Sequence, residues 1–194
     1  MMNDIRLVSW DVDGTLYSHL SLAFVLLQNA FRATLSTGPI SMGKTFVQVL
    51  EFHRKVEKQR KNPDCEVLLP ELEELKQAEN FERRALEIAL RNIRPRECAV
   101  DLLKRFADKG TIQVAFSDFE CEYKLEALGL SHYFQKSYSC RQIGFWKPSP
   151  VGLSCIQREF GVDSQQHLHV GDRPATDGKA CMRNGCRFLH MTGK

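Results

Sequence analysis

The sequence predicts an α/β fold in which a doubly wound parallel sheet carries an inserted all-α subdomain. Short apolar runs alternate with helical patterns in the second half of the chain, and one similar run stands near the N-terminus. Runs that are apolar throughout are typical of parallel strands covered by helices on both faces. Roughly seventy residues after the first run contain no strand pattern, which predicts the insert.

Five runs are expected to form the strands. IRLVSW, TIQVAF and HLHV occupy 5–10, 111–116 and 167–170, and QKSYS and CRFLH occupy 135–139 and 186–190. Helices should connect them, because proline favours the first helical turn and glycine the position after the last. Helix starts are predicted at Pro95 and Pro150. Helix ends are predicted at Gly110, Gly129, Gly161 and Gly185. Strands that alternate with helices in this way indicate a doubly wound sheet.

Residues 18–91 form the expected helical insert. Its helical spacing is seen at Phe46, Leu50, His53 and Val56 or Glu57, and again at Leu72, Leu75, Ala85 and Ile88 or Ala89. Asn62-Pro63 and Pro70 interrupt these patterns. We therefore divide the chain into a core, 1–17 and 92–194, and a helical subdomain, 18–91.

Composition and charge are those of an ordinary globular protein, with 43% hydrophobic residues, 26% charged residues and a net charge of +3. Basic residues cluster at 54–61, but Glu51 and Glu57 interrupt them. A solvated helix face is therefore favoured over a nucleic-acid-binding patch. No nucleic-acid partner is expected.

The cysteines and the apolar runs indicate a cytoplasmic protein without a membrane partner. The seven cysteines include no CxxC pair and no zinc-finger spacing, which fits a reducing compartment. The first eleven residues carry Asp4, Arg6 and Asp11, which a signal peptide would lack. The longest apolar run, 20–27, is too short to span a bilayer. The oligomeric state stays open.

Polar residues follow three of the predicted strands. Asp11 and Asp13 follow the first, Ser117 follows the second, and Asp172 follows the HLHV strand. The carboxyl ends of parallel strands meet in one crevice, where ligands bind. The carboxylates of Asp11 and Asp13, one residue apart, repel each other when held this close. A bound cation or a shared proton is therefore expected at the end of the first strand. Lys147, which precedes a helix, is placed to join them.

Four segments together resemble the motifs of the haloacid dehalogenase superfamily of aspartyl-phosphate hydrolases. They are DVDGTL (11–16), AFSD (115–118), KPSP (147–150) and GDRPATD (171–177), in the family's order. The resemblance covers the core and implies a Rossmann-like sheet. It also identifies 18–91 as a cap of the C1 type, as in phosphoglycolate-phosphatase-like members.

The resemblance implies a role for each residue at the strand ends. Asp11 would be the nucleophile that forms an aspartyl-phosphate, and Asp13 would be the general acid and base. Mg²⁺, which prefers oxygen ligands, would bind Asp11, the main-chain carbonyl of Asp13, and Asp172. Ser117 would donate a hydrogen bond to the phosphoryl group. Lys147 would neutralise charge on the nucleophile and in the transition state.

The resemblance also implies supporting roles. Asp177 would orient either metal-bound water or Lys147, while Gly14 and Thr15 would allow the tight turn after the nucleophile. Two features depart from the family pattern. Asp118 stands where phosphatases of this branch commonly carry Asn. The sequence ends at Lys194, soon after the last predicted strand, so the usual final helix is expected to be shortened or absent.

The implied function is a Mg²⁺-dependent phosphatase that acts on a small phosphorylated metabolite. Dehalogenases lack the second carboxylate, so Asp13 argues against that activity. A phosphomutase or phosphotransferase shares all four motifs and stays an alternative. A non-catalytic binding scaffold is a further alternative, although such proteins usually lose Asp11, Asp13 or Lys147.

Taken singly, several of these residues have simpler explanations. A calcium loop is disfavoured, because Leu16 and Leu22 stand where an EF-hand needs Gly and Glu. Ser117 alone could cap a strand end and Lys147 alone could be a surface lysine. Asp177 could be a carboxylate favoured by a helix dipole. His167 and His169 alternate along a strand as metal ligands could, but structural roles are favoured.

Overall fold

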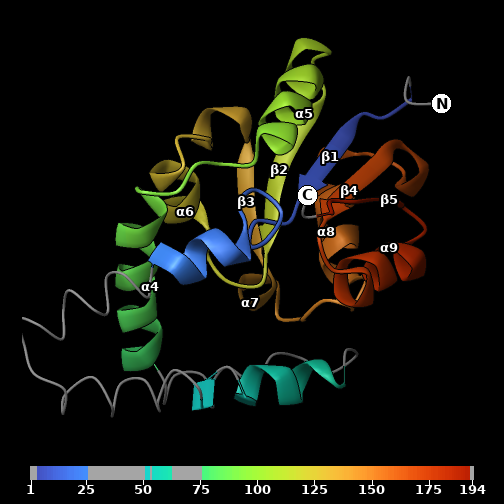
Figure 1. Ribbon diagram of the computed structural model, residues 1–194. Helices are drawn as coiled ribbons and strands as arrows, with labels where there is room; N and C mark the ends of the chain where they lie inside the picture. The colour runs from blue at the N-terminus through green and yellow to red at the C-terminus, as the bar shows by residue number, and fades with distance from the viewer. Residues whose placement is uncertain (1–3, 26–50, 53, 63–75, 193–194) are drawn as a thin grey trace, which may run out of the picture.

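The computed structural model of this 194-residue chain describes residues 4–25, 51–52, 54–62 and 76–192. Five parallel strands form one sheet in the order β3-β2-β1-β4-β5 (Figure 1). The strands are β1 (Leu7–Trp10), β2 (Ile112–Ser117), β3 (Lys136–Ser139), β4 (His167–Gly171) and β5 (Arg187–His190). All five predicted strands and the α/β class are confirmed.

The register of the sheet brings the ends of its central strands close together, with β2 and β4 running only slightly beyond the end of β1. Trp10 of β1 pairs with Ala115 of β2 on one side and with Val170 of β4 on the other. The residues that follow these positions therefore lie together at the carboxyl edge. Since β1 separates β2 from β4, this edge includes the point where the strand order reverses, the usual ligand crevice of such sheets.

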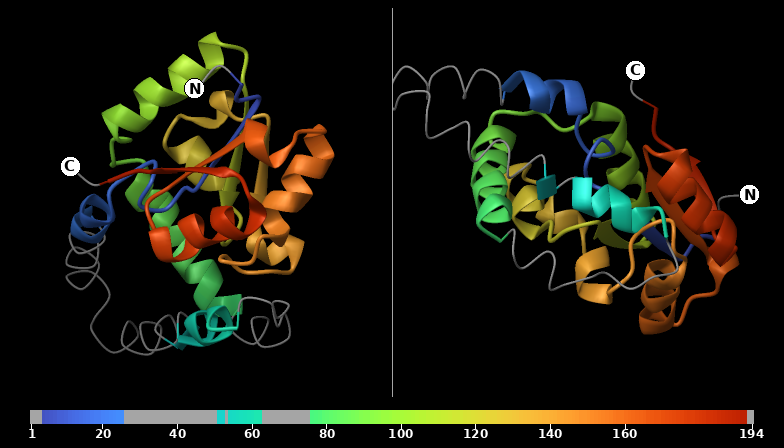
Figure 2. Two further views of the ribbon diagram at one scale, coloured as in Figure 1. Left: turned by 90° about the vertical axis from the view of Figure 1, so that its right-hand side faces the viewer. Right: turned by 90° about the horizontal axis from the view of Figure 1, so that it is seen from below.

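Helices cover both faces of the sheet, as Figure 2 shows. The helices are α4 (Lys76–Leu90), α5 (Glu97–Asp108), α6 (Glu122–Ala127), α7 (Cys140–Ile143), α8 (Val151–Phe160) and α9 (Lys179–Asn184). Short single turns add η1 (Ser131–Tyr133), η2 (Ser164–Gln166) and η3 (Pro174–Gly178). The apolar residues of α5 and α6 pack with Val8 and Trp10, whereas those of α8 and α9 pack with Leu7 and Val114. The successive residues of β1 thus face two separate cores.

Glycine ends the helices where the sequence predicts it. Gly161 and Gly185 are left-handed C-caps of α8 and α9, and Gly129 follows the C-cap of α6 with φ +70°. The start of α5 differs, because the helix begins at Glu97 and not at Pro95. Arg96 stays extended, with ψ 126°, while its N–H donates to Leu16 O at 2.8 Å. This bond ties the chain to the loop after β1.

The described residues of the insert are helical or lie in turns. Helical residues occur at 19–25, 51–52, 54–60 and in α4. Phe52 and Val56 are buried in the same core as Trp146, and α4 packs against α6. The pattern at Phe46 and Leu50 lies outside the described residues, as do His53, Leu72, Leu75 and the interruptions at Pro63 and Pro70. The division at 18 and 91 stays a prediction.

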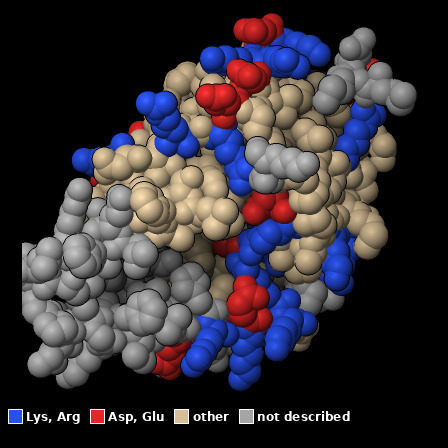
Figure 3. All heavy atoms as spheres, viewed as in Figure 1, with Lys and Arg blue, Asp and Glu red and all other residues tan. Residues whose placement is uncertain are grey.

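Charge is mixed on the face shown in Figure 3, where Lys and Arg lie among Asp and Glu. Within the basic segment at 54–61, Glu57 pairs with Arg60 at 2.5 Å. In the part of the chain that the structure describes, no helix is long and apolar enough to cross a membrane.

Candidate active site

Asp11 directly follows β1 and is buried at the carboxyl edge of the sheet. Its N–H donates to Val170 O at 2.8 Å, which continues the pairing of β1 with β4 by one residue. Thr15, one helical turn further on, donates from Oγ1 to Asp11 Oδ2 at 3.2 Å. The loop after the strand therefore folds back onto the carboxylate and fixes one of its oxygens.

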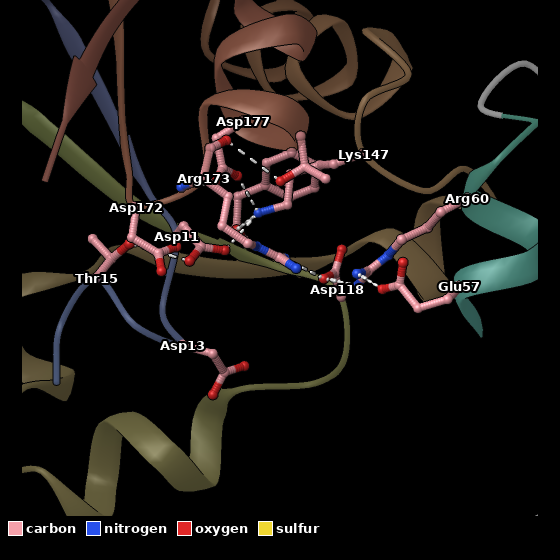
Figure 4. A network of polar contacts seen from close by, with 12 residues as sticks. Asp11, Asp13, Thr15, Glu57, Arg60, Asp118, Lys147, Asp172, Arg173 and Asp177 are labelled. Carbon is pink, nitrogen blue, oxygen red and sulfur yellow. Dashed lines mark hydrogen bonds and ion pairs between the residues drawn. The ribbon is translucent and has the colours of Figure 1, made fainter. Parts of the chain in front are cut away.

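Lys147 is fully buried between two carboxylates. Its Nζ lies 2.5 Å from Asp11 Oδ1, 2.7 Å from Asp177 Oδ1 and 3.4 Å from the carbonyl of Phe116 (Figure 4). A buried lysine needs such partners, because desolvation of an unpaired ammonium is costly. The two aspartates together hold the pKa of Lys147 well above its ordinary value despite its burial.

One ammonium shared by two carboxylates leaves Asp11 and Asp177 in different electrostatic states. Burial raises the pKa of Asp11 to about 7, against the opposing effect of Lys147. For Asp177 the charge of Lys147 and a hydrogen bond from His169 outweigh burial, and the pKa falls below its ordinary value. In the absence of a cation, the ionised form is therefore disfavoured at Asp11 and favoured at Asp177.

Three carboxylates form a candidate cation site. Asp11, Asp172 and Asp177 each offer an oxygen, and these atoms lie within 4.8 Å of one another. Asp172 Oδ1 is buried and has no hydrogen-bond partner in the described part of the chain, which suits an atom that binds a metal. Both oxygens of Asp177 already accept hydrogen bonds, from Lys147, His169 and the N–H of Arg173. Both oxygens of Asp11 likewise accept hydrogen bonds, from Lys147 and Thr15. Asp172 Oδ1 is therefore the oxygen most clearly available to a cation, with Asp11 and Asp177 beside it.

Gly14 makes the close approach of Asp172 possible. It has φ +86°, a conformation that favours glycine, and a Cβ there would collide with Asp172 Oδ2 and with His19 Nε2. His19 lies 3.4 Å from the same Asp172 oxygen. The hydrogen bond to Asp172 raises the pKa of His19, against its partial burial. The turn after β1 thus packs directly against the end of β4.

A buried chain of hydrogen bonds supports Asp177 from behind. Ser9 Oγ lies 2.8 Å from His167 Nε2 and 2.7 Å from His169 Nδ1, and His169 Nε2 lies 3.3 Å from Asp177 Oδ1. The Gln157 amide contacts His167 Nδ1 at 3.0 Å. If Gln157 donates, each group in turn can donate to the next, and both imidazoles are neutral. The structural roles predicted for His167 and His169 fit this arrangement; Ser9 and Gln157 were not foreseen.

The sequence led us to expect that the side chains of Asp13 and Asp11 point the same way. In the structure the Asp13 side chain is directed away from the other carboxylates (Figure 4). Lys124 Nζ contacts both of its oxygens, at 2.7 and 2.6 Å, and the Tyr17 hydroxyl donates to Oδ1. Burial opposes ionisation, but the charge of Lys124 outweighs it and lowers the pKa of Asp13. The motif spacing predicts where the backbone of Asp13 lies, whereas its rotamer depends on Lys124, which lies in no motif.

Asp118 makes the most extensive ionic contacts not foreseen from the sequence. It accepts a hydrogen bond from Arg173 Nη2 at 3.0 Å and pairs with Arg60 Nη2. Burial would raise the pKa of Asp118, but the charges of Arg60, Lys147 and Arg173 hold it below its ordinary value. Ser117, just before it, is buried at the end of β2. Arg60 carried no sequence signal beyond its charge, and Arg173 lies within the GDRPATD motif but was given no role there.

The predicted site residues lie around the carboxyl ends of β1, β2 and β4. The side chains of Asp11, Thr15, Lys147, Asp172 and Asp177 are brought together. Ser117 lies at the adjacent strand end, and Gly14 lies against Asp172. The carboxylate of Asp13 is the one that stands apart.

Fold and site together define a class: an α/β protein with a buried aspartate–lysine pair and a cluster of carboxylates, a candidate cation site, at the switch point of its sheet. Residues 5–185 match the model of the haloacid dehalogenase-like hydrolases, and the chain belongs to that family. The resemblance seen in the four sequence motifs is therefore confirmed at the level of the family.

Three similar proteins illustrate the range of this family. A glyceraldehyde 3-phosphate phosphatase from Methanopyrus kandleri is 24% identical over 93% of this chain and 81% of its own. The magnesium-bound structure of the HAD-hydrolase YfnB from Bacillus subtilis has a TM-score of 0.68 at 18% identity, covering 96% of this chain and 88% of that one. A 2-haloacid dehalogenase from Pseudomonas syringae has a TM-score of 0.64 at 22% identity, covering 96% and 86%. The two structures establish the fold alone.

Proposed function

We propose that this protein is a Mg²⁺-dependent phosphatase that hydrolyses a small phosphorylated metabolite through an aspartyl-phosphate on Asp11. The observation that carries the proposal is the buried Asp11 carboxylate held by Lys147 at 2.5 Å beside the acidic cation site. The phosphatase name of the M. kandleri relative, the family's hydrolase chemistry and the magnesium bound to YfnB support it.

Asp11 attacks the phosphorus atom, a P–O bond forms to its carboxylate, and the bond to the leaving oxygen breaks. Lys147 neutralises charge on Asp11 and on the phosphoryl oxygens, and Ser117 donates to one of these oxygens. Thr15, bound to the other oxygen of Asp11, keeps the nucleophile in place. Asp11, Asp172 and the main-chain carbonyl of Asp13 would hold Mg²⁺, which would supply charge neutralisation at the phosphoryl group.

Asp13 protonates the leaving oxygen in the first step and takes a proton from water in the second. Water then attacks phosphorus, the P–O bond to Asp11 breaks, and inorganic phosphate leaves. Lys124 and Tyr17 hold Asp13 ionised in the structure, which is the state needed for the second step. Before the first step Asp13 must therefore take up a proton from solvent, and the proton that it later takes from water restores this acid form. A halide leaving group needs no such acid, so Asp13 favours phosphate esters over haloacids as substrates.

We further propose that the inserted residues 18–91 act as a cap over this site. Helical residues 51–52 and 54–60 support this. The ring centroids of Phe52 and Phe119 lie 5.2 Å apart, and Gln59 accepts a hydrogen bond from Trp146 Nε1 at 2.7 Å. Arg60 at the end of this segment reaches Asp118 beside the site. A cap of this kind excludes bulk water and contacts the part of the substrate beyond the phosphate.

The test is release of inorganic phosphate from an aryl phosphate and from a panel of phosphorylated metabolites, with Mg²⁺ or with a chelator. Asp11→Asn should abolish release while the protein stays folded. Asp163→Asn, the same chemical change at an exposed residue far along the chain, should leave it unchanged. No release by the folded, Mg²⁺-supplied wild type from any ester in the panel would overturn the proposal in favour of a binding scaffold.

A further inference from the structure

Three charged side chains from three separate segments meet beside the proposed phosphate site. Arg60 ends the helical residues 54–60, Asp118 follows β2, and Arg173 follows β4. Both arginines contact the same oxygen, Asp118 Oδ2 (Figure 4). Asp118 also adjoins Ser117 in the sequence, so the group lies within the reach of a substrate whose phosphate is bound at Asp11.

The two arginines have more donors than this contact uses. Arg60 Nε, Arg173 Nε and Asp118 Oδ1 are buried and lack a hydrogen-bond partner in the part of the chain that the structure describes. Asp118 itself is more than nine-tenths buried. Buried polar atoms are normally hydrogen-bonded, so two unpaired donors beside one unpaired acceptor indicate that a ligand completes the group.

Charge decides which ligand fits. Arginine is always protonated, so two positive charges face the single carboxylate of Asp118. Glu57 also contacts Arg60, but its side chain is 64% exposed and water screens its charge. An excess of positive charge therefore stays around the Asp118 carboxylate. The planar guanidinium fork suits a carboxylate or a phosphate, which it binds through two parallel hydrogen bonds.

The arginines are also held in place before any ligand arrives. The Arg60 side chain is 11% exposed, and its guanidinium lies over the Trp146 ring at 5.8 Å from the centroid. Asp118 fixes Arg173, whose side chain is 37% exposed and accessible from solvent. Donors that are already ordered lose little entropy on binding, which favours recognition of a small anion.

We infer that Arg60 and Arg173 form a subsite for an anionic group, a carboxylate or a second phosphate, that the substrate carries beyond its scissile phosphate. The inference rests on the proposed phosphatase function. Asp118 positions the two guanidinium groups, and their unpartnered Nε–H groups are the donors available to the anion. The protein would thus select doubly anionic phosphate esters over neutral ones of the same size.

The experiment compares three phosphonates that cannot be hydrolysed, each titrated calorimetrically with Mg²⁺ present. Propylphosphonate has no second anion, 3-phosphonopropionate adds a carboxylate, and propane-1,3-bisphosphonate adds a second phosphonate. The wild type should bind at least one doubly anionic ligand about tenfold more tightly than propylphosphonate, as expected for a charged hydrogen bond. The tighter of the two shows which anion the subsite takes.

Arg60→Gln should reduce this preference to about threefold or less, and Arg60→Lys, which keeps the charge but not the fork, should restore part of it. Arg91→Gln is the matched control, because Arg91 makes an exposed ion pair with Glu87 at 2.8 Å and lies outside the site. It should keep the full preference. Circular dichroism and thermal unfolding verify that each variant folds.

Two results would overturn the subsite: equal affinity of the wild type for all three ligands, or full preference in a folded Arg60→Gln variant. Neither touches the phosphatase proposal, which the aryl phosphate assay tests separately. A wild type that hydrolyses no phosphate ester and binds none of the phosphonates would overturn both proposals together.

Discussion

The pairing of Asp11 with Lys147 shows how single residues determine the chemistry of this site. Both are buried, and each would be strongly destabilised without the other. Lys147 also serves Asp177, so the ammonium offsets two carboxylates and Asp11 keeps a raised pKa. A cation on Asp11 and Asp172 would lower that pKa. The raised pKa of Asp11 is therefore consistent with the proposed cation site.

Lys124→Met tests whether Lys124 positions Asp13. The variant removes the cation that contacts both Asp13 oxygens, and Asp13 should lose its fixed rotamer. We expect kcat to fall about tenfold to a hundredfold with little change in KM, because Asp13 acts in the chemical steps. Stability should fall by only about 1–2 kcal/mol, since Asp13 is partly exposed to water.

Lys136→Met is the control for this variant. Lys136 makes an ion pair of similar length, 2.6 Å, with Glu159, but both side chains are exposed. Its replacement should change neither kcat nor stability measurably. If Lys124→Met kept wild-type kcat, Asp13 would not depend on Lys124 for its position.

His167 should make the protein less stable in acid. Burial holds the pKa of His167 at about 3 in the folded protein, below the ordinary value of 6.5. Below about pH 6.5 the unfolded chain therefore binds a proton that the folded protein does not, and stability falls as the pH falls toward 3. Between pH 7 and pH 5 the loss from this residue is about 2 kcal/mol.

His167→Gln should remove this part of the pH dependence. The measurement is the free energy of unfolding in urea at both pH values, for the wild type and the variant. His132→Gln, which replaces an exposed histidine, should leave the pH dependence as in the wild type. Equal slopes in the wild type and in His167→Gln would contradict the prediction.

At the scale of elements, the turn after β1 is the most constrained segment of the site. Gly14→Ala should place a methyl group against Asp172 and His19 in addition to its backbone cost at positive φ, about 1–2 kcal/mol. Since Asp172 is a candidate Mg²⁺ ligand, the variant should lose about tenfold or more in Mg²⁺ affinity and in phosphatase activity, measured by calorimetry and phosphate release.

Gly110→Ala separates the backbone cost from the collision. Gly110 also has positive φ, +66°, but a Cβ there would meet nothing within 4 Å. It should lower stability by about 1–2 kcal/mol and leave Mg²⁺ affinity and activity unchanged. Wild-type Mg²⁺ affinity in Gly14→Ala would show that Asp172 moves aside without consequence for the metal.

The strand ends show why much of this site could be predicted from the sequence. Asp11, Ser117 and Asp172 each follow an apolar run, and the parallel register makes their convergence a consequence of topology. Lys124 and Arg60 could not be found in this way. They lie on helices outside the motifs, and their roles depend on side-chain directions that helical periodicity does not specify. The α5 start was misplaced for a similar reason, a contact between Arg96 and Leu16 across the fold.

At the scale of the whole molecule, Mg²⁺ should connect β1 and β4 and stabilise the fold. Asp11 follows β1 and Asp172 follows β4, and their carboxylates approach within 4.8 Å together with Asp177. The unfolded chain does not hold these residues together. Mg²⁺ at a hundredfold excess over its dissociation constant should therefore raise the free energy of unfolding by about 2.7 kcal/mol.

The check is thermal and urea-induced unfolding with Mg²⁺ or with a chelator, repeated on Asp172→Asn. Asp172→Asn removes one charge from the crowded cluster, so the metal-free variant should be as stable as the metal-free wild type or more stable. It should, however, lose most of the gain from Mg²⁺, whereas Asp163→Asn should keep it. If Mg²⁺ stabilised Asp172→Asn as strongly as the wild type, the metal would bind elsewhere. Lys147 and the hydrogen-bond donors around the cluster would then be the groups that offset its negative charge.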